Sequence, residues 1–252
     1  MKTLLAARRP DPKLSPRLLL AGAGFLVAVV PVALLAYLTS HGWGPLHALD
    51  QGTTDALHTW AVARPGAVRF LSEVSTVLHP QVLRVVAVAA AGWLVLRGQR
   101  RLALWVVVTA VGSGVIDTVL KDVVRRARPA LPDPVAAASG YSFPSGHALG
   151  TVVIFGMALL LVLPLLRRPA ARVAAWVLAV GCVALVGFAR VALGLHYVSD
   201  VLAGWLVGLG WLAVTVAAFE SWRRSRGRRS RAPGDVLHEG VDPAGSRLAA
   251  RR

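Results

Sequence analysis

Residues 141–150, YSFPSGHALG, lead directly into residues 151–166, TVVIFGMALLLVLPLL. The second segment is an apolar run, and about 20 apolar residues in a helix span the roughly 30 Å hydrocarbon core of a bilayer. The first segment places Ser145, Gly146 and His147 at the point where this helix is expected to begin. The two segments together predict a membrane helix whose first turn carries polar, reactive groups.

Apolar blocks of similar length recur along the chain. Of its 252 residues, 56% are hydrophobic, and they form long uninterrupted blocks rather than amphipathic stripes. Blocks of this kind are typical of membrane helices. We expect six spans, at about residues 18–38, 81–96, 102–120, 147–166, 173–193 and 198–219. The sequence therefore predicts an all-α, polytopic membrane protein, a six-helix bundle whose first span is an uncleaved anchor rather than a signal peptide.

Basic residues predict the orientation of these spans. The chain has 28 Lys and Arg against 12 Asp and Glu, a formal net charge of +16. In a soluble protein this excess would indicate nucleic-acid binding. Most of it falls in four segments that six spans place on one side of the membrane: residues 1–17, 97–101, 167–172 and 223–231. By the positive-inside rule that side is the cytoplasm, so we expect membrane lipids and no nucleic acid as partners.

The same reasoning divides the chain into three parts. Residues 1–17 are expected to form a basic cytoplasmic N-terminus, and residues 18–222 the six-helix membrane domain. Residues 223–252 are rich in Arg, Gly, Ser and Pro with little apolar content, so we expect a disordered basic tail in the cytoplasm. The first outer connection, residues 39–80, shows short helical patterns of its own.

A minority of the basic residues oppose the positive-inside rule, because they fall on the outer side or at the outer ends of spans. They are Arg64, Arg69, Arg84, Lys121, Arg125, Arg126, Arg128 and Arg190. For the cations of the third and fifth spans, an anionic ligand is the simplest explanation. Lys121 and Arg128 are seven residues apart, so a continuing helix would place both on one face.

Two further clusters have chemistry that suits an anion. A helix N-terminus offers unpaired N–H groups and the positive end of the helix dipole, and Gly146 would let the backbone approach a ligand closely. Ser145 and Gly146 therefore predict an anion site with His147 beside it. His196 and Asp200 are four residues apart, neighbours on one helix face. A carboxylate bonded to one imidazole nitrogen fixes the tautomer and leaves the other nitrogen free to attack.

The order and spacing of these residues resemble a known family. Lys-x6-Arg-Pro, Pro-Ser-Gly-His and Arg-x5-His-x3-Asp, in this order in a six-span protein, look like the three motifs of the type 2 phosphatidic acid phosphatase superfamily. The matching residues are Lys121, Arg128 and Pro129, then Pro144, Ser145, Gly146 and His147, then Arg190, His196 and Asp200. The resemblance covers about residues 15–222. One departure is Ala189, where the family usually has a serine.

The resemblance implies a membrane phosphatase that hydrolyses a lipid phosphate or diphosphate without a metal or other cofactor. His196 would be the nucleophile and form a phosphohistidine, Asp200 would orient it, and His147 would protonate the leaving oxygen and then activate water. The phosphoryl oxygens would be held by Lys121, Arg128, Ser145, Gly146 and Arg190. The site would lie at the extracytoplasmic face of the cell membrane. Phosphatidic acid, phosphatidylglycerophosphate and undecaprenyl diphosphate all present such a group, so the lipid stays open, as does the oligomeric state.

Other interpretations also stay open. The same phosphohistidine could pass its phosphoryl group to a lipid or sugar, which would make the protein a phosphotransferase. A non-enzymatic membrane carrier would not need the two histidines and the aspartate. We interpret Asp117, one turn before Lys121, as a structural salt-bridge partner. Arg125 and Arg126 would either widen the anion site or contact lipid headgroups. The outer-connection histidines lack the spacing of a metal site: His41, His47, His58 and His79.

Overall fold

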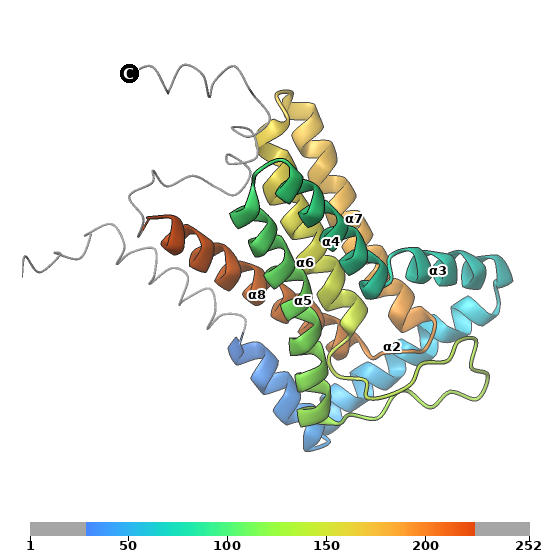
Figure 1. Ribbon diagram of the computed structural model, residues 1–252. Helices are drawn as coiled ribbons and strands as arrows, with labels where there is room; N and C mark the ends of the chain where they lie inside the picture. Colours follow the sequence, from blue (N-terminus) through green and yellow to red (C-terminus); the bar gives the residue numbers. More distant parts are fainter. Residues whose placement is uncertain (1–28, 225–252) are drawn as a thin grey trace, which may run out of the picture.

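The computed structural model describes residues 29–224 (Figure 1). Within this range the chain forms helices and connections and no strand. The helices, in chain order, are Val29–Ser40, α2 Gly44–Val62, α3 Pro65–Val77, α4 Pro80–Leu96, α5 Arg100–Val124, α6 Gly146–Val162, α7 Pro169–Ala192 and α8 Val198–Arg224, with a 3₁₀ turn, η1 Leu163–Leu165, after α6. The all-α prediction is confirmed for the described residues.

Five stretches of the described chain are long and apolar enough to cross a membrane. Four of them are α5, α6 with η1, α7 and α8, which agree with the last four predicted spans to within a few residues. The fifth is Pro65–Leu96, which comprises α3 and α4, and its second half coincides with the predicted second span. Of the predicted first span, residues 29–38 are described, as part of a short apolar helix. The first predicted span, residues 18–38, therefore stays a prediction, and so does the total of six spans.

Two of the predicted parts fall on terminal residues. The predicted N-terminal segment 1–17 lies outside the described residues, and so does the predicted tail beyond residue 224. Residues 223 and 224 themselves form the last turn of α8. The cytoplasmic position of both termini stays a prediction.

Helix α6 is the centre of the bundle. It contacts α4, α5, α7 and α8, and every residue from Ala148 to Ile154 is buried. In Figure 1, α4 to α7 run in broadly one direction and α8 crosses them obliquely. Two glycines of α8 permit this crossing: a Cβ atom on Gly204 would lie 2.6 Å from the carbonyl oxygen of Ser145, and one on Gly208 3.0 Å from that of Leu149. Small residues let the backbones of membrane helices approach closely, so α8 packs directly on the first turns of α6.

The two ends of the bundle differ. The basic connections between α4 and α5 and between α6 and α7 lie at the upper end in Figure 1, whereas α2, α3 and the connection 125–145 lie at the lower end. Both α2 and α3 contact α7. The outer connection 39–80 is thus largely helical, and it packs where α5 and α7 end and α6 and α8 begin.

Local backbone signals bring the polar segments to this lower end. Arg125 ends α5 in the left-handed conformation, with φ of 50°. Ser145 is the N-cap of α6, and its hydroxyl accepts the Ala148 N–H at 3.5 Å. The Ser145 N–H in turn donates to the backbone carbonyl of Asp200 at 3.0 Å, which joins the start of α6 to the first turn of α8. Gly194, with φ of 71°, turns the chain from α7 toward His196. The three polar clusters of the sequence therefore meet in space.

Candidate active site

A cavity of about 660 Å³ lies at this end of the bundle. Residues of α3, α4, α5, α6 and α7 and of the two connections 125–145 and 193–197 line it. Six of the eight predicted site residues are among them: Lys121, Arg128, Gly146, His147, Arg190 and His196. The other two, Ser145 and Asp200, are completely buried next to it. The structure therefore brings all three sequence clusters to one site, while the roles of the residues stay predictions.

His196 has its two ring nitrogens in different environments. Its Nδ1 lies 3.5 Å from Oδ2 of Asp200, and its Nε2 lies 3.2 Å from Nη1 of Arg128. A guanidinium only donates hydrogen bonds, so Nε2 is the unprotonated nitrogen in this arrangement and Nδ1 carries the hydrogen that faces Asp200. In this tautomer Nε2 has the lone pair and accepts the N–H of Arg128.

Burial keeps this imidazole neutral. His196 is 2% exposed, and burial is the main reason that its pKa falls from 6.5 to about 4. Asp200 opposes the decrease, and the cations Arg190 and Arg128 add to it. At neutral pH the His196 side chain is therefore a neutral imidazole, and its Nε2 lone pair accepts the N–H of Arg128.

Arg128 is positioned by the backbone rather than by an acid. Its guanidinium donates to the carbonyl oxygen of Leu195 at 2.7 Å, and also to three carbonyls of the connection, those of Ser139, Gly140 and Tyr141. Carbonyl partners fix its geometry without cancelling its charge, so the charge is available to an anion in the cavity.

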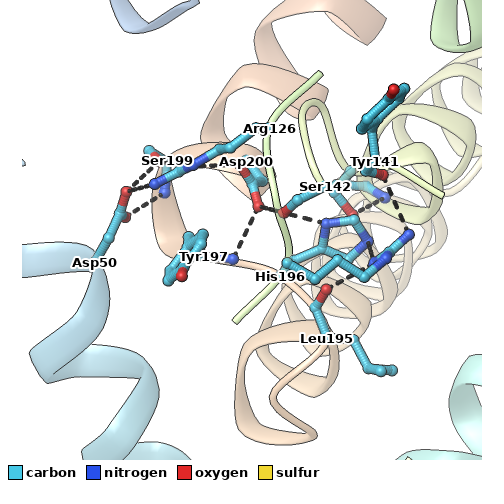
Figure 2. Close-up of polar contacts among 12 residues, drawn as sticks. Asp50, Arg126, Tyr141, Ser142, Leu195, His196, Tyr197, Ser199 and Asp200 are labelled. Atoms are coloured by element: carbon cyan, nitrogen blue, oxygen red, sulfur yellow. Dashed lines mark hydrogen bonds and ion pairs between the residues drawn. The ribbon is translucent and has the colours of Figure 1, made fainter. Parts of the chain in front are cut away.

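Asp200 is the centre of a buried polar network (Figure 2). Its Oδ2 accepts hydrogen bonds from the Ser142 hydroxyl and, at 2.9 Å, from the Tyr197 N–H. Its Oδ1 accepts from Nη1 of Arg126 at 2.7 Å, and Nη2 of Arg126 pairs with Asp50 of α2, also at 2.7 Å. Ser199 links to Asp50 through both its N–H and its hydroxyl. The carboxylate beside His196 is thus held from three directions.

The position of Arg126 agrees with neither of the two roles considered for it. Its guanidinium neither widens the anion site nor contacts headgroups, because it points to Asp50 and Asp200 and stacks over the ring of Tyr197 at 4.1 Å. Burial alone would lower the pKa of Arg126, but the charges of Asp200 and Asp50 outweigh it and raise the pKa. Arg126 is a structural cation behind the site, whereas Arg128, two residues later, lines the cavity.

Two predicted phosphate ligands have a structural partner as well. Lys121 forms the expected salt bridge with Asp117, 2.8 Å from Nζ to Oδ2. Gly146 packs against the same carboxylate, since a Cβ atom there would lie 2.6 Å from Oδ2 of Asp117. The hydroxyl of Ser145 caps α6 and is not part of the cavity wall. Gly146 is therefore required by the approach of Asp117, in addition to any ligand.

Sequence reasoning did not assign the cavity residues His79 and Arg84, nor Asp50 behind it. His79 caps the start of α4, and its ring meets that of His147 edge to face, 4.8 Å between centroids. Arg84 had one signal in the sequence, as a cation against the positive-inside rule. Asp50 had none, because its partners Arg126 and Ser199 are far along the chain. Within residues 29–224, no three His, Cys, Asp or Glu side chains are grouped to hold a metal ion.

The second half of the chain is similar to a known protein family. Residues 102–224 match the family model of the PAP2 superfamily. Phosphatidylglycerophosphatase B of Bacillus subtilis is 38% identical over 97 residues, which cover 37% of this chain and 46% of that protein. Undecaprenyl-diphosphatase of Sulfolobus acidocaldarius is 33% identical over 135 residues, 51% of this chain and 60% of that protein. Lipid phosphate phosphatase delta of Arabidopsis thaliana is 34% identical over 132 residues, 46% of this chain and 32% of that protein.

These alignments span between 32% and 60% of the relatives' own lengths. A crystal structure of a transmembrane PAP2 type phosphatidylglycerolphosphate phosphatase from Bacillus subtilis superposes with a TM-score of 0.64 at 23% identity, covering 84% of this chain and 98% of that one. The two proteins therefore share their fold. The similarity to the PAP2 superfamily is carried by residues 102–224, just under half of the chain.

The network around Arg126 can be tested by a double-mutant cycle. Arg126→Gln leaves the buried carboxylates of Asp50 and Asp200 without their cation, which typically costs about 3–5 kcal/mol. Adding Asp50→Asn removes one of the two unpaired charges, so we expect the double variant to be more stable than Arg126→Gln alone. Thermal unfolding in detergent measures the stabilities of the variants. A double variant no more stable than Arg126→Gln alone, or with a loss equal to the sum of the two single losses, would contradict a shared charge network.

Proposed function

We propose that this protein is a membrane phosphatase that hydrolyses a lipid phosphate or diphosphate through a phosphohistidine on His196. The observation that carries the proposal is the environment of one side chain. His196 lines a cavity together with Arg128, Arg190 and Lys121, its Nε2 lies 3.2 Å from the Arg128 guanidinium, and its Nδ1 lies 3.5 Å from Asp200. A neutral nucleophile surrounded by fixed cations suits attack on an anionic phosphorus centre.

In the first step, Nε2 of His196 attacks the phosphorus atom and the bond to the lipid-side oxygen breaks. The imidazole becomes positively charged, and the carboxylate of Asp200 stabilises that charge. The phosphoryl oxygens would contact the guanidiniums of Arg128 and Arg190 and the ammonium of Lys121. Phosphoryl transfer depends mainly on positioning and charge neutralisation, and these cations are already in place.

His147 would serve both steps. It occupies the first turn of α6 and lines the cavity, so it can protonate the leaving oxygen. In the second step the same imidazole would take a proton from water, which attacks the phosphohistidine and releases phosphate. The amides at the start of α6, including that of Gly146, offer N–H groups to the phosphoryl oxygens. The chemistry needs no metal ion in this scheme.

Phosphate release by the purified protein tests the proposal. We expect release from short-chain lipid phosphates or diphosphates in the presence of EDTA. Activity requires neutral His196, so it should be retained as pH falls below 6.5 and be lost as pH passes through about 4. A requirement for added magnesium, or phosphate that appears only on a second lipid or sugar, would argue against a metal-independent hydrolase.

Substitutions of His147 and His196 should have different effects on the hydrolysis of an activated aryl phosphate. Such a leaving group needs little protonation, so His147→Ala should still form the phosphoenzyme and then hydrolyse it slowly, with general acid–base catalysis worth about 10²–10⁴-fold. We expect a burst of aryl alcohol and trapped phosphohistidine from His147→Ala, and neither from His196→Ala. Rapid-quench kinetics measures the burst. A burst from His196→Ala alone would mean that the roles are exchanged.

We also propose that the cavity faces away from the cytoplasm. The basic connection 97–101 lies at the end of the bundle opposite to the cavity (Figure 1), and the positive-inside rule assigns that connection to the cytoplasm. A substrate would then enter from the outer leaflet.

Single cysteines can test this orientation in intact cells. Cys182 is the one native cysteine, so Cys182→Ser gives a cysteine-free background. Ala137→Cys at the exposed cavity wall should react with an impermeant maleimide, and Gln99→Cys between α4 and α5 should react only after the cells are opened. Reaction at Gln99→Cys in intact cells, with Ala137→Cys protected, would reverse the orientation.

A further inference from the structure

Arg84 is a charged residue in the second predicted span, and the proposed reaction assigns it no role. It lies on α4 and lines the cavity, and its Nε is buried with no hydrogen-bond partner in the described part of the chain. Among residues 29–224, no carboxylate oxygen lies within 4.0 Å of its guanidinium. An unpaired cation within a membrane segment is costly, and such residues usually mark a functional site. The structure therefore leaves Arg84 without a partner that its position requires.

The predicted phosphate ligand Arg190 shares this property. It also lines the cavity, and its Nε is likewise buried with no partner among the described residues. Of the four cations in the cavity wall, Lys121 is matched by Asp117. Asp200 is paired outside the cavity with Arg126. Arg84 thus stands with Arg128 and Arg190 as a cation whose charge is free for an anionic ligand.

The α5 backbone makes room for Arg84. A Cβ atom on Gly114 would lie 2.8 Å from Cζ of Arg84 and 3.1 Å from its Nη2. The guanidinium therefore rests on α5 at the level of Gly114, three residues before Asp117 and seven before Lys121. At about 1.5 Å per residue, this level is roughly 5 Å deeper in the bundle than Asp117 and roughly 10 Å deeper than Lys121.

For a membrane-anchored substrate, depth along α5 determines which part of the headgroup a residue can contact. Its hydrocarbon chain lies in the bilayer, so the groups nearest the chain lie deepest. The terminal phosphate would lie at His196, and a second phosphate between it and the chain would lie on the Arg84 side. The cavity volume of about 660 Å³ compares with about 30 Å³ for each water in the liquid, so a second phosphate has room.

We propose that Arg84 forms a second anion subsite that binds the lipid-side phosphate, and that the preferred substrates are lipid diphosphates. This inference rests on the proposed phosphatase function. His196 Nε2 would form a bond to the terminal phosphorus, and the bond to the bridging oxygen would break. The electron pair goes to the departing lipid monophosphate, whose charge Arg84 stabilises, and water then releases inorganic phosphate from His196.

Two substrates with the same chain separate this role from general phosphate binding. Farnesyl diphosphate and farnesyl phosphate differ by one phosphate, and kcat/KM of the purified full chain is measured with both. For Arg84→Gln we expect a loss of about 10- to 100-fold on the diphosphate, the value of hydrogen bonds to charged groups. On the monophosphate we expect a change of less than about threefold, which also shows that the variant is folded.

Three further variants sharpen the test. Arg84→Lys keeps the charge without the planar fork, so its loss on the diphosphate should be intermediate. Gly114→Ala displaces the guanidinium without changing any charge, and should lower activity selectively on the diphosphate. Arg97→Gln is the matched control, because Arg97 ends the same helix α4 away from the cavity and lies over Trp93. It should affect neither substrate.

Binding of inorganic diphosphate and of inorganic phosphate, followed by calorimetry, provides a readout without turnover. We expect the wild-type protein to bind diphosphate more tightly and Arg84→Gln to lose most of that preference. Equal losses on both farnesyl substrates, or no loss on either, would overturn the subsite. If the wild-type protein hydrolyses neither substrate but retains the Arg84-dependent preference for diphosphate, the phosphatase function fails and the anion subsite remains.

Discussion

The contacts of Asp200 hold the site together. Its carboxylate is joined to Arg126 and to Ser142 of the connection 125–145, and it faces Nδ1 of His196. Its backbone carbonyl accepts the N–H of Ser145, the N-cap of α6. Through Arg126 it also reaches Asp50 on α2. One residue in the first turn of α8 therefore fixes α2, α6, the long connection and His196 relative to one another.

The buried carboxylates of this network need all of their polar partners. Asp50 and Asp200 are both completely buried, and a buried carboxylate without a cation and hydrogen bonds would be strongly destabilising. Arg126 supplies the cation. Ser199 donates hydrogen bonds to Asp50, and the Ser142 hydroxyl and the Tyr197 N–H donate to Asp200. Because an apolar core could replace a buried ion pair at little loss of stability, the network is better explained by the orientation of His196 than by stability.

The cavity has the opposite electrostatic character. Arg84, Arg128 and Arg190 line it without an acidic partner among residues 29–224, and burial holds the His196 imidazole in its neutral form. The protein thus separates two kinds of arginine. The charge of Arg126 is neutralised by Asp50 and Asp200 outside the cavity. Arg128 is held by backbone carbonyls, so its charge is available to a ligand in the cavity. This separation suits a protein that recognises an anion at a membrane face, where uncompensated cations would otherwise be costly.

The sequence by itself determined the parts that depend on local chemistry. The helices α5 to α8 followed from the length of apolar runs, and the start of α6 from Ser145 and Gly146, since hydrophobic length and capping act within a few residues. The spacing of Lys121, Arg128, His147, Arg190, His196 and Asp200 predicted a common site, and the structure brings them together.

Tertiary structure alone decided which cations line the cavity. Arg126 and Arg128 are two residues apart in the sequence. Arg126 pairs with Asp50, 76 residues away, whereas Arg128 lines the cavity, and no local feature of the sequence distinguishes them. Asp50, His79 and Arg84 likewise joined the site only because α2 and α4 pack beside it. A side chain's partner depends on which segments the whole fold brings within a few ångströms, and hydrophobic patterning specifies that helices form without specifying these contacts.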